Sequence, residues 1–355
     1  MTIGGTKLRR GEVLLGRFRV DGLLGEGGMG TVYLAWHLSL DMPVAIKVIR
    51  APLEQSAQLH IRLQREARAI ARLRSEYVCR PLDFGSLESG EPFLVMEYLQ
   101  GIPLSQYARA RHDLSHLVDL ALQTAAGLAE AHRFGLIHRD VKPSNILVTG
   151  APGSRCIAKL VDFGLAKALD FDTVITGAGQ VLGTPEFMSP EQAMSSPDVD
   201  FRTDVWSLGV VLHWLVTGTM PFDGATRMRM LTSILHDEPN LAHAAWAQVP
   251  ALRETVALCL VKAPERRLKS VAAFAERLEP FAGEEGRIAA SIVKATLTDA
   301  WSTTHGTPPD EAIAFMGAAT TAVSEVSATA ETAATGRTQF AQELRTPRPR
   351  GQGEK

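Results

Sequence analysis

Two short stretches in the middle of the chain combine residue types that handle phosphate and metal. The first, HRDVKPSN, runs from His138 to Asn145 and contains Asp140 and Lys142, and the second, DFG, begins at Asp162. Carboxylate and amide oxygens are ligands that Mg²⁺ prefers, and the ion takes its other ligands from water and phosphate. Together with a lysine, they suit the positioning of an alcohol, a triphosphate and divalent metal ions.

A glycine cluster lies near the N-terminus. The sequence GEGGMGTV, which begins at Gly25, separates residues 17–24 from residues 31–36, and both of these read as strands. Gly25, Gly27 and Gly30 let the backbone approach phosphate oxygens closely enough for its N–H groups to bind them. The same spacing occurs in dinucleotide-binding folds, where it joins a strand to a helix, and an ordinary glycine-rich hairpin is the other alternative.

A lysine and a glutamate add to this pattern. Lys47 follows Ala45 on one face of a predicted strand, and a small residue beside a cation suits a flat base and its phosphates. An ordinary surface lysine is the alternative. Glu66 falls in the apolar stripe of a helix predicted over residues 59–74, where a buried carboxylate needs a partner. We predict that this partner is Lys47, although an arginine of the same helix is an alternative.

The elements that must position these residues are strands in the first third and helices thereafter. Further strands are predicted at 44–49 and 93–98, and helices at 115–134, 204–217, 251–261 and 270–279. The fold class is therefore α+β, with an antiparallel sheet lobe containing one helix, followed by a larger, mainly helical lobe.

Composition divides the chain into three parts. They are an N-terminal extension (1–16), a two-lobed domain (17–283, made of 17–100 and 101–283) and a tail (284–355). The tail is rich in alanine and threonine, with twelve threonines from Thr296 onward, and has few large apolar residues. We predict that it is disordered, because it cannot bury enough surface to offset its chain entropy.

Charge and cysteine content exclude several classes of protein. The 37 basic and 39 acidic residues give a net charge of −2, which does not favour nucleic acid or an anionic membrane as a partner. The three cysteines have neither disulfide-framework nor metal-ligand spacing, so we predict a reducing, cytoplasmic location. The apolar run over residues 205–216 is too short to cross a bilayer.

In their order and spacing, the motifs resemble those of the eukaryotic-like (Hanks-type) protein kinases, most closely the bacterial serine/threonine branch. The resemblance covers residues 17–283 and implies the bilobal protein kinase fold. It also implies transfer of the γ-phosphoryl group of ATP, with Mg²⁺ or alternatively Mn²⁺, to Ser/Thr hydroxyls of proteins. The implied roles are base for Asp140, γ-phosphate neutralisation for Lys142, α/β-phosphate binding for Lys47, positioning of that lysine for Glu66, and metal binding for Asn145 and Asp162.

The resemblance also implies a nucleotide site. Its expected residues are Leu24, Gly25, Glu26, Gly27, Gly28, Met29, Gly30, Val32, Ala45, Lys47, Met96, Glu97, Leu99 and Leu147. Met96 would be the gatekeeper, and the backbone of Glu97 and Leu99 would bind adenine. The side chains that would sandwich the ring are Val32, Ala45 and Leu147.

An activation segment is expected over residues 162–191. The resemblance implies a buried ion pair between Glu191 and Arg267, and a cap from Asp204 on the catalytic-loop backbone. Because Arg139 precedes the base, it would bind an anion, and the phosphorylation candidates are Thr173 and Thr176. These threonines are alternatively ordinary loop residues.

Two other classes of protein were weighed. A catalytically silent scaffold usually lacks a lysine or metal residue, and none is missing here. A small-molecule phosphotransferase generally lacks a segment like the one ending at Glu191. The expected partners are protein substrates in a bacterial signalling pathway, phosphothreonine-binding (FHA-type) proteins and a second copy contacting the small lobe.

Overall fold

The computed structural model describes residues 7–28, 30–50, 56–110, 112–150, 155–163, 185–196 and 198–299. The chain forms two contact units, residues 1–301 and 302–355, and the second lies outside the described residues. No helix in the described ranges combines the length and hydrophobicity that a bilayer crossing requires.

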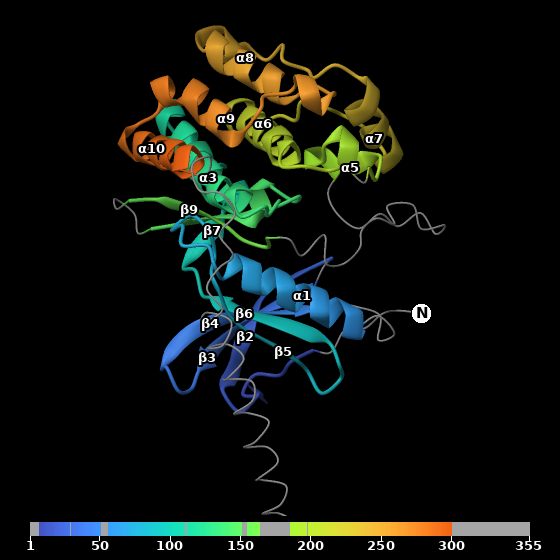
Figure 1. Ribbon diagram of the computed structural model, residues 1–355, viewed down its shortest axis with the longest axis vertical. Helices are drawn as coiled ribbons and strands as arrows, with labels where there is room; N and C mark the ends of the chain where they lie inside the picture. The colour runs from blue at the N-terminus through green and yellow to red at the C-terminus, as the bar shows by residue number, and fades with distance from the viewer. Residues whose placement is uncertain are drawn as a thin grey trace, which may run out of the picture. The chain divides into compact units, whose positions relative to one another are not determined.

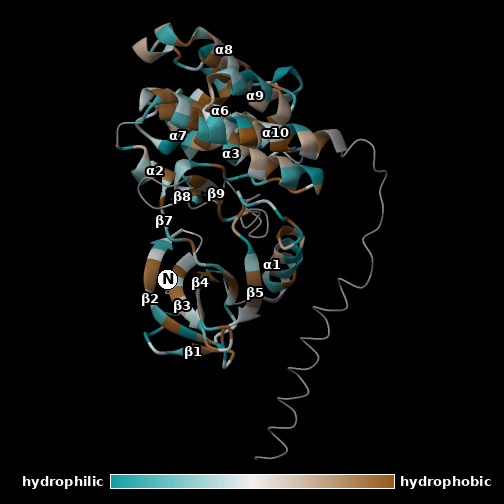
Figure 2. Cartoon of the chain, turned by 90° about the vertical axis from the view of Figure 1, so that its left-hand side faces the viewer, coloured by the Kyte–Doolittle hydropathy of each residue, from teal (hydrophilic) through white to brown (hydrophobic). Residues whose placement is uncertain are grey.

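The N-terminal lobe is built on an antiparallel sheet of order β1-β2-β3-β4-β6-β5 (Figure 1). Its strands are β1 (Val13–Leu14), β2 (Phe18–Gly27), β3 (Gly30–His37), β4 (Met42–Ile49), β5 (Pro81–Ser86) and β6 (Pro92–Glu97). Figure 2 shows hydrophobic segments on β2 and β3. Because strand residues alternate between faces, the sheet has two apolar clusters, one on Phe18, Ile46 and Val95 and one on Ala45 and Met96.

Helix α1 (Ser56–Ile70) packs against β5 and β6 and carries Glu66 (Figure 1). Leu63 and Ile70 are buried, as the apolar stripe predicted, whereas Glu66 is only half-buried. The single helix of the small lobe is therefore where the sequence predicted it.

The C-terminal lobe combines helices with a small sheet of order β7-β8-β9. The strands are β7 (Gly101–Pro103), β8 (Ile146–Thr149) and β9 (Ile157–Leu160). The helices are α2 (Leu104–Tyr107), α3 (Leu114–Arg133), α5 (Pro190–Ala193), α6 (Arg202–Thr217), α7 (Arg227–His236), α8 (Pro250–Cys259), α9 (Val271–Leu278) and α10 (Glu284–Asp299). Short 3₁₀ turns are η2 (Pro143–Asn145), η3 (Pro185–Phe187), η4 (Ala244–Gln248), η5 (Pro264–Arg266) and η6 (Glu279–Phe281).

One apolar core holds this lobe together. Helices α3 and α6 contact each other, and their central residues are almost all buried. Trp206 of α6 is fully buried and stacks on Phe222, with ring centroids 5.4 Å apart. This core supports the loops that carry the predicted site.

Two predicted boundaries are wrong. Leu14 of β1 and Leu8 are buried in the sheet core, so much of the predicted extension 1–16 belongs to the small lobe. Residues 284–299, predicted as part of a disordered tail, form α10, which packs along α3 (Figure 1). The rest of that predicted tail, from residue 300, lies outside the described residues.

Helix α10 escaped the sequence prediction because small side chains make its contact with α3. Ala289, Ala290 and Val293 are fully buried, but two alanines contribute little to an apolar stripe. A residue far away in the sequence holds the start of the helix, since Gly283 N–H donates to Asp119 Oδ1 at 2.7 Å. Burial raises the pKa of the Asp119 carboxyl, although hydrogen bonds from the backbone N–H groups of Gly283 and Gly286 act in the opposite direction.

Replacing Gly286 by alanine should therefore destabilise the domain. A Cβ atom there would lie 2.2 Å from Asp119 Oδ1 and 2.9 Å from Ala282 Cβ. Overpacking of this kind costs about 1–3 kcal/mol. Urea denaturation should show the loss in Gly286→Ala but not in the control Ser291→Ala, which changes an exposed residue of the same helix. An equal effect of both changes would show that α10 is not held by the Asp119 contact.

Candidate active site

The loop that carries Asp140 is held by a buried aspartate. At the start of α6, Asp204 accepts hydrogen bonds from the backbone N–H groups of His138 and Arg139, each at 2.9 Å. Its Oδ2 also lies 2.8 Å from His132 Nε2. Burial alone raises the pKa of Asp204, but the hydrogen bond with His132 and neighbouring charges outweigh it, so the pKa is lowered. The predicted cap is confirmed.

Three of the predicted catalytic and metal-binding residues meet around one carboxylate. Lys142 Nζ donates to Asp140 Oδ2 at 2.8 Å, and Asn145 Nδ2 donates to the same oxygen at 2.8 Å. Asn145 Nδ2 also binds the backbone oxygen of Asp140 at 2.9 Å. Both side-chain donors therefore use Oδ2, and Asp140 Oδ1 is the oxygen that can still accept a bond.

Asp162 enters the same region from the neighbouring strand. Strands β8 and β9 pair antiparallel, with Ile146 opposite Leu160, which brings the residue before β8 and the end of β9 to one edge. Val161 N–H donates to the carbonyl of Asn145 at 2.9 Å. Asp162 has φ 65°, a left-handed conformation that costs a non-glycine residue about 1–3 kcal/mol and is typical of functional sites.

The cation beside Asp162 is Lys47, whose predicted partner is Glu66. Lys47 Nζ lies 2.7 Å from Asp162 Oδ1, and its side chain is only 5% exposed. A buried ammonium needs a nearby anion, and Asp162 supplies one. The pairing of Lys47 with the half-buried Glu66 stays a prediction.

A histidine packs beneath these residues and was not predicted to have a role. His138 is fully buried; its ring centroid lies 4.4 Å from that of Phe163, and its Nε2 lies 3.0 Å from Val161 O. Burial lowers the pKa of His138, which favours the neutral form of the ring. It joins the loop of Asp140 to the segment of Asp162, and its position directly before Arg139-Asp140 was the available sequence signal.

The predicted adenine-binding residues share one face of the small-lobe sheet. Val32, Lys47 and Leu94 are aligned across β3, β4 and β6, and Ala45 pairs with Met96 in the next row. The apolar cluster on this face also includes Val32 and Leu99. Leu147 is half-buried on β8, the strand that follows Asn145.

Glu97 adds a contact that the sequence prediction lacked. Its N–H donates to Arg80 O at 3.0 Å, and its carboxylate binds Lys159 Nζ at 2.8 Å. Lys159 lies on β9, so this ion pair joins β6 to the small sheet of the C-terminal lobe. Nothing in the sequence around Lys159 indicated that role.

The glycine cluster forms a hairpin between β2 and β3, which excludes the strand-to-helix geometry of dinucleotide folds. Gly25 pairs with Val32, and Gly27 with Gly30. Gly30 is required sterically, because its φ is 156° and a Cβ atom would lie 2.1 Å from Val48 O. Gly25 and Gly27 face open space, so their backbone is accessible to a ligand. The other predicted loop residues, Leu24, Glu26 and Gly28, are exposed, and Met29 lies outside the described residues.

The predicted ion pair of Glu191 with Arg267 is confirmed. The two guanidinium nitrogens of Arg267 donate to the two oxygens of Glu191, at 2.7 and 2.9 Å, and both side chains are buried. Gln192 was missed: its amide donates to Arg139 O at 2.7 Å and so joins α5 to the catalytic loop. The S-x-x-Q capping box formed with Ser189 was the signal that could have identified it.

The donor set fits a hard divalent cation. Because Asn145 uses its amide nitrogen on Asp140, its Oδ1 is left to bind a metal beside the carboxylate of Asp162. Two protein oxygens suit Mg²⁺, which keeps waters and binds phosphates. The phosphorylation candidates Thr173 and Thr176 lie outside the described residues, so their predicted role is not tested.

Comparison with known proteins defines the family. The family model for the protein kinase domain matches residues 18–278, and the chain belongs to this family. It is 38% identical over 286 residues to serine/threonine-protein kinase pkn3 of Myxococcus xanthus, covering 78% of this chain and 52% of that protein. It is also 38% identical over 276 residues to PknA of Mycobacterium tuberculosis, covering 76% of this chain and 62% of that protein.

A solved structure supports the fold. The PknI kinase domain of Mycobacterium tuberculosis superposes with a TM-score of 0.59 at 26% identity, covering 78% of this chain and all of that chain. The predicted bilobal α+β fold and the resemblance to bacterial eukaryotic-like kinases are both confirmed. The chain spans about half the length of pkn3, so the comparison concerns the kinase domain.

Proposed function

We propose that this chain is a serine/threonine protein kinase that transfers the γ-phosphoryl group of Mg-ATP to protein hydroxyls. The observation that carries this proposal is the convergence of Lys47, Asp140, Lys142, Asn145 and Asp162. These residues come from β4, the catalytic loop and the segment after β9, which are far apart in the sequence. Bound ATP supplies the phosphoryl group and bound Mg²⁺, or alternatively Mn²⁺, neutralises its charge.

Each side chain of this site has a separate role. Asp140 Oδ1 accepts the hydrogen bond of the substrate hydroxyl and orients it, because Oδ2 is already bound by Lys142 and Asn145. Lys142 stays beside the base, where its charge stabilises the negative charge on the transferred group. Lys47 sits beside Asp162 and binds the α- and β-phosphates. Because these groups are fixed before reaction, little reorganisation is needed.

Phosphorylation of the activation segment is a second part of the proposal. Arg139 Nε is buried and has no hydrogen-bond partner among the described residues, and φ at this residue is 66°. A guanidinium in that setting favours an anion, and a phosphate is the strongest one a protein can supply. We therefore propose that autophosphorylation at Thr173 or Thr176 supplies it.

The remaining expectations are also part of this proposal. We place the protein in the cytoplasm, because its three cysteines form no disulfide with one another. We place it in a bacterial signalling pathway, because the relatives named above are bacterial. Its proposed partners are protein substrates, FHA-type proteins that bind its phosphothreonines, and a second copy through the small lobe.

Incubation with Mg-ATP followed by mass spectrometry tests the activity. Phosphothreonine or phosphoserine should appear on the protein, including in residues 164–184, and should be absent without divalent metal. The control is nucleotide binding, measured by titration with a fluorescent ATP analogue. A preparation that binds nucleotide but transfers no phosphate would instead support a catalytically silent scaffold.

A further inference from the structure

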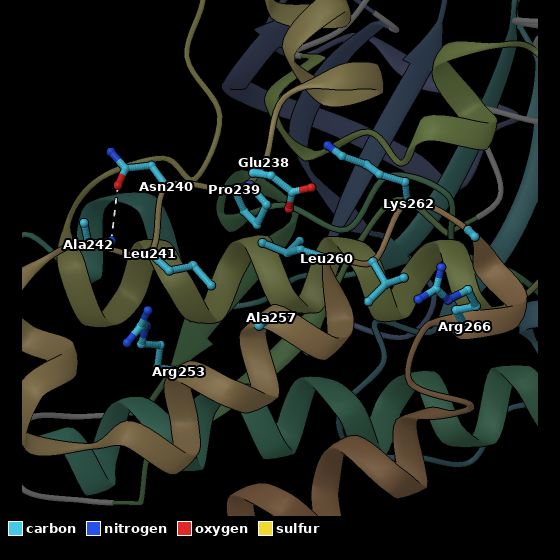
Figure 3. A pocket seen from close by; sticks show the side chains of 12 residues that line it. Glu238, Pro239, Asn240, Leu241, Ala242, Arg253, Ala257, Leu260, Lys262 and Arg266 are labelled. Atoms are coloured by element: carbon cyan, nitrogen blue, oxygen red, sulfur yellow. Dashed lines mark hydrogen bonds between the residues drawn. The ribbon is translucent and has the colours of Figure 1, made fainter.

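The C-terminal lobe has a pocket of about 650 Å³ that the predicted catalytic residues do not line (Figure 3). Its walls are the loop 238–242 after α7, one side of α8 and the connection 261–266. Ligand pockets in proteins typically have volumes of about 300–1,000 Å³, so this one can hold several side chains. None of the motifs considered above accounts for it.

The pocket has an apolar middle and a cationic residue at each end. Leu241, Ala257 and Leu260 lie between Arg253 and Arg266 in Figure 3. Both arginines are exposed, and neither has an ion pair with any residue that the structure describes. Other charges nearby are already compensated, because Arg277 pairs with Glu254 at 2.9 Å and Arg267 pairs with Glu191.

The third cation of the lining, Lys262, has a structural role. Its Nζ donates to Ile234 O at 2.6 Å and lies 3.9 Å from the Phe222 ring centroid, so the ammonium faces inward. Burial lowers its pKa to about 8, although Glu238 opposes that shift. The lining holds one acidic residue, Glu238, against the basic residues Arg253, Lys262 and Arg266, so its charge is net positive.

We propose that this pocket docks a peptide segment of a protein partner, in which apolar residues are flanked on both sides by acidic residues. The apolar side chains would occupy the space between Leu241 and Leu260, and the carboxylates would bind Arg253 and Arg266. Guanidinium groups suit this task because they bind carboxylates with two parallel hydrogen bonds.

The exposed rim favours a peptide over a small metabolite. Small-molecule sites usually enclose most of the ligand surface, whereas Arg253, Arg266, Glu238 and Asn240 are all exposed here. A polypeptide can enter and leave such a groove at both ends. We take the partner to be a protein substrate of the kinase, and this choice rests on the proposed function. Docking itself does not require phosphoryl transfer.

The pocket wall is connected to the end of the activation segment. Carbonyl oxygens of Val261 and Lys262 accept hydrogen bonds from Arg267 at 3.1 and 3.2 Å, and Arg267 in turn holds Glu191. The same wall supports α7 through Lys262, and α7 contacts α5 and η3. A docked segment would therefore be anchored on elements that contact α5, which is joined to the catalytic loop through Gln192.

Fluorescence anisotropy tests the docking directly. The probe is a fluorescein-labelled peptide with two leucines flanked on each side by two aspartates. It should bind the full chain, and Arg253→Glu/Arg266→Glu should raise its Kd by at least about 10-fold, with weaker binding at high salt. The matched control is Arg287→Glu, an exposed arginine on α10, which should leave the Kd unchanged. A peptide with lysines in place of the aspartates should not bind.

The proposal is overturned if the probe does not bind at about 1 mM, or if the double variant binds it as well as the parent protein does. Competition by suberate as strongly as by unlabelled peptide would also overturn it, in favour of a dicarboxylate site. Binding should be the same in Asp140→Asn, so a failure of the proposed activity leaves this test intact. In active protein, fusing the docking peptide to a substrate should lower KM and leave kcat unchanged, and the double variant should remove that gain.

Discussion

Asp140→Asn is expected to lower the rate of phosphoryl transfer by roughly 100- to 10,000-fold, the usual contribution of a positioned base. Asparagine has nearly the same shape, but its amide group cannot take up a proton. It also cannot offer two acceptor oxygens, one to Lys142 and Asn145 and the other to a substrate hydroxyl. The loss should therefore appear in kcat.

Nucleotide affinity should change little in this variant, because the proposed phosphate and metal contacts of Lys47 and Asp162 do not use Asp140. Steady-state transfer to a serine/threonine peptide and titration with a fluorescent ATP analogue separate the two quantities. The matched control is Asp41→Asn, an exposed aspartate in the turn between β3 and β4 that accepts from Trp36 Nε1 at 2.9 Å. If Asp140→Asn kept a tenth or more of the parent rate, Asp140 would not be the base.

Local sequence pattern predicted the elements that carry the site. Short apolar and β-branched runs, two of them flanking the glycine cluster, predicted β2, β3, β4 and β6, and apolar periodicity predicted α1, α3, α6, α8 and α9, within a few residues. Motif spacing placed Asp140 and Asn145 on one loop, and the 3₁₀ turn Pro143–Asn145 brings Asn145 to Asp140. Asp204 and Glu191 were placed by the resemblance, and their partners are those it implied.

The errors have a common physical origin in long-range packing. Helical periodicity placed Glu66 on the apolar side of α1, but the contact of Lys47 with Asp162 joins two segments that lie far apart in the sequence and had no local signal. Likewise, the contact of α10 with α3 depends on small residues, which have little hydrophobic signal in the sequence. The pocket between α7 and α8 arises from three separate segments, none of which has a motif.

Removing the guanidinium of Arg267 is expected to have the largest effect on stability. Arg267→Ala would leave the carboxylate of Glu191 buried without a counter-charge, and breaking a buried pair in this way costs about 3–5 kcal/mol. It would also remove donors from the carbonyls of Val261 and Arg202. Urea denaturation monitored by tryptophan fluorescence should show a much lower midpoint than the parent protein has.

Two further variants test whether the loss of stability comes from the buried charge of Glu191. Arg17→Ala removes an arginine whose ion pair with Asp83 is partly exposed, at 40% and 30%, and should cost less than about 1 kcal/mol. Glu191→Gln/Arg267→Met removes both charges and should be more stable than Arg267→Ala, because no unpaired ion stays buried. If the double variant were as unstable as the single one, packing and backbone hydrogen bonds of Arg267 would explain the loss, and the buried charge of Glu191 would not.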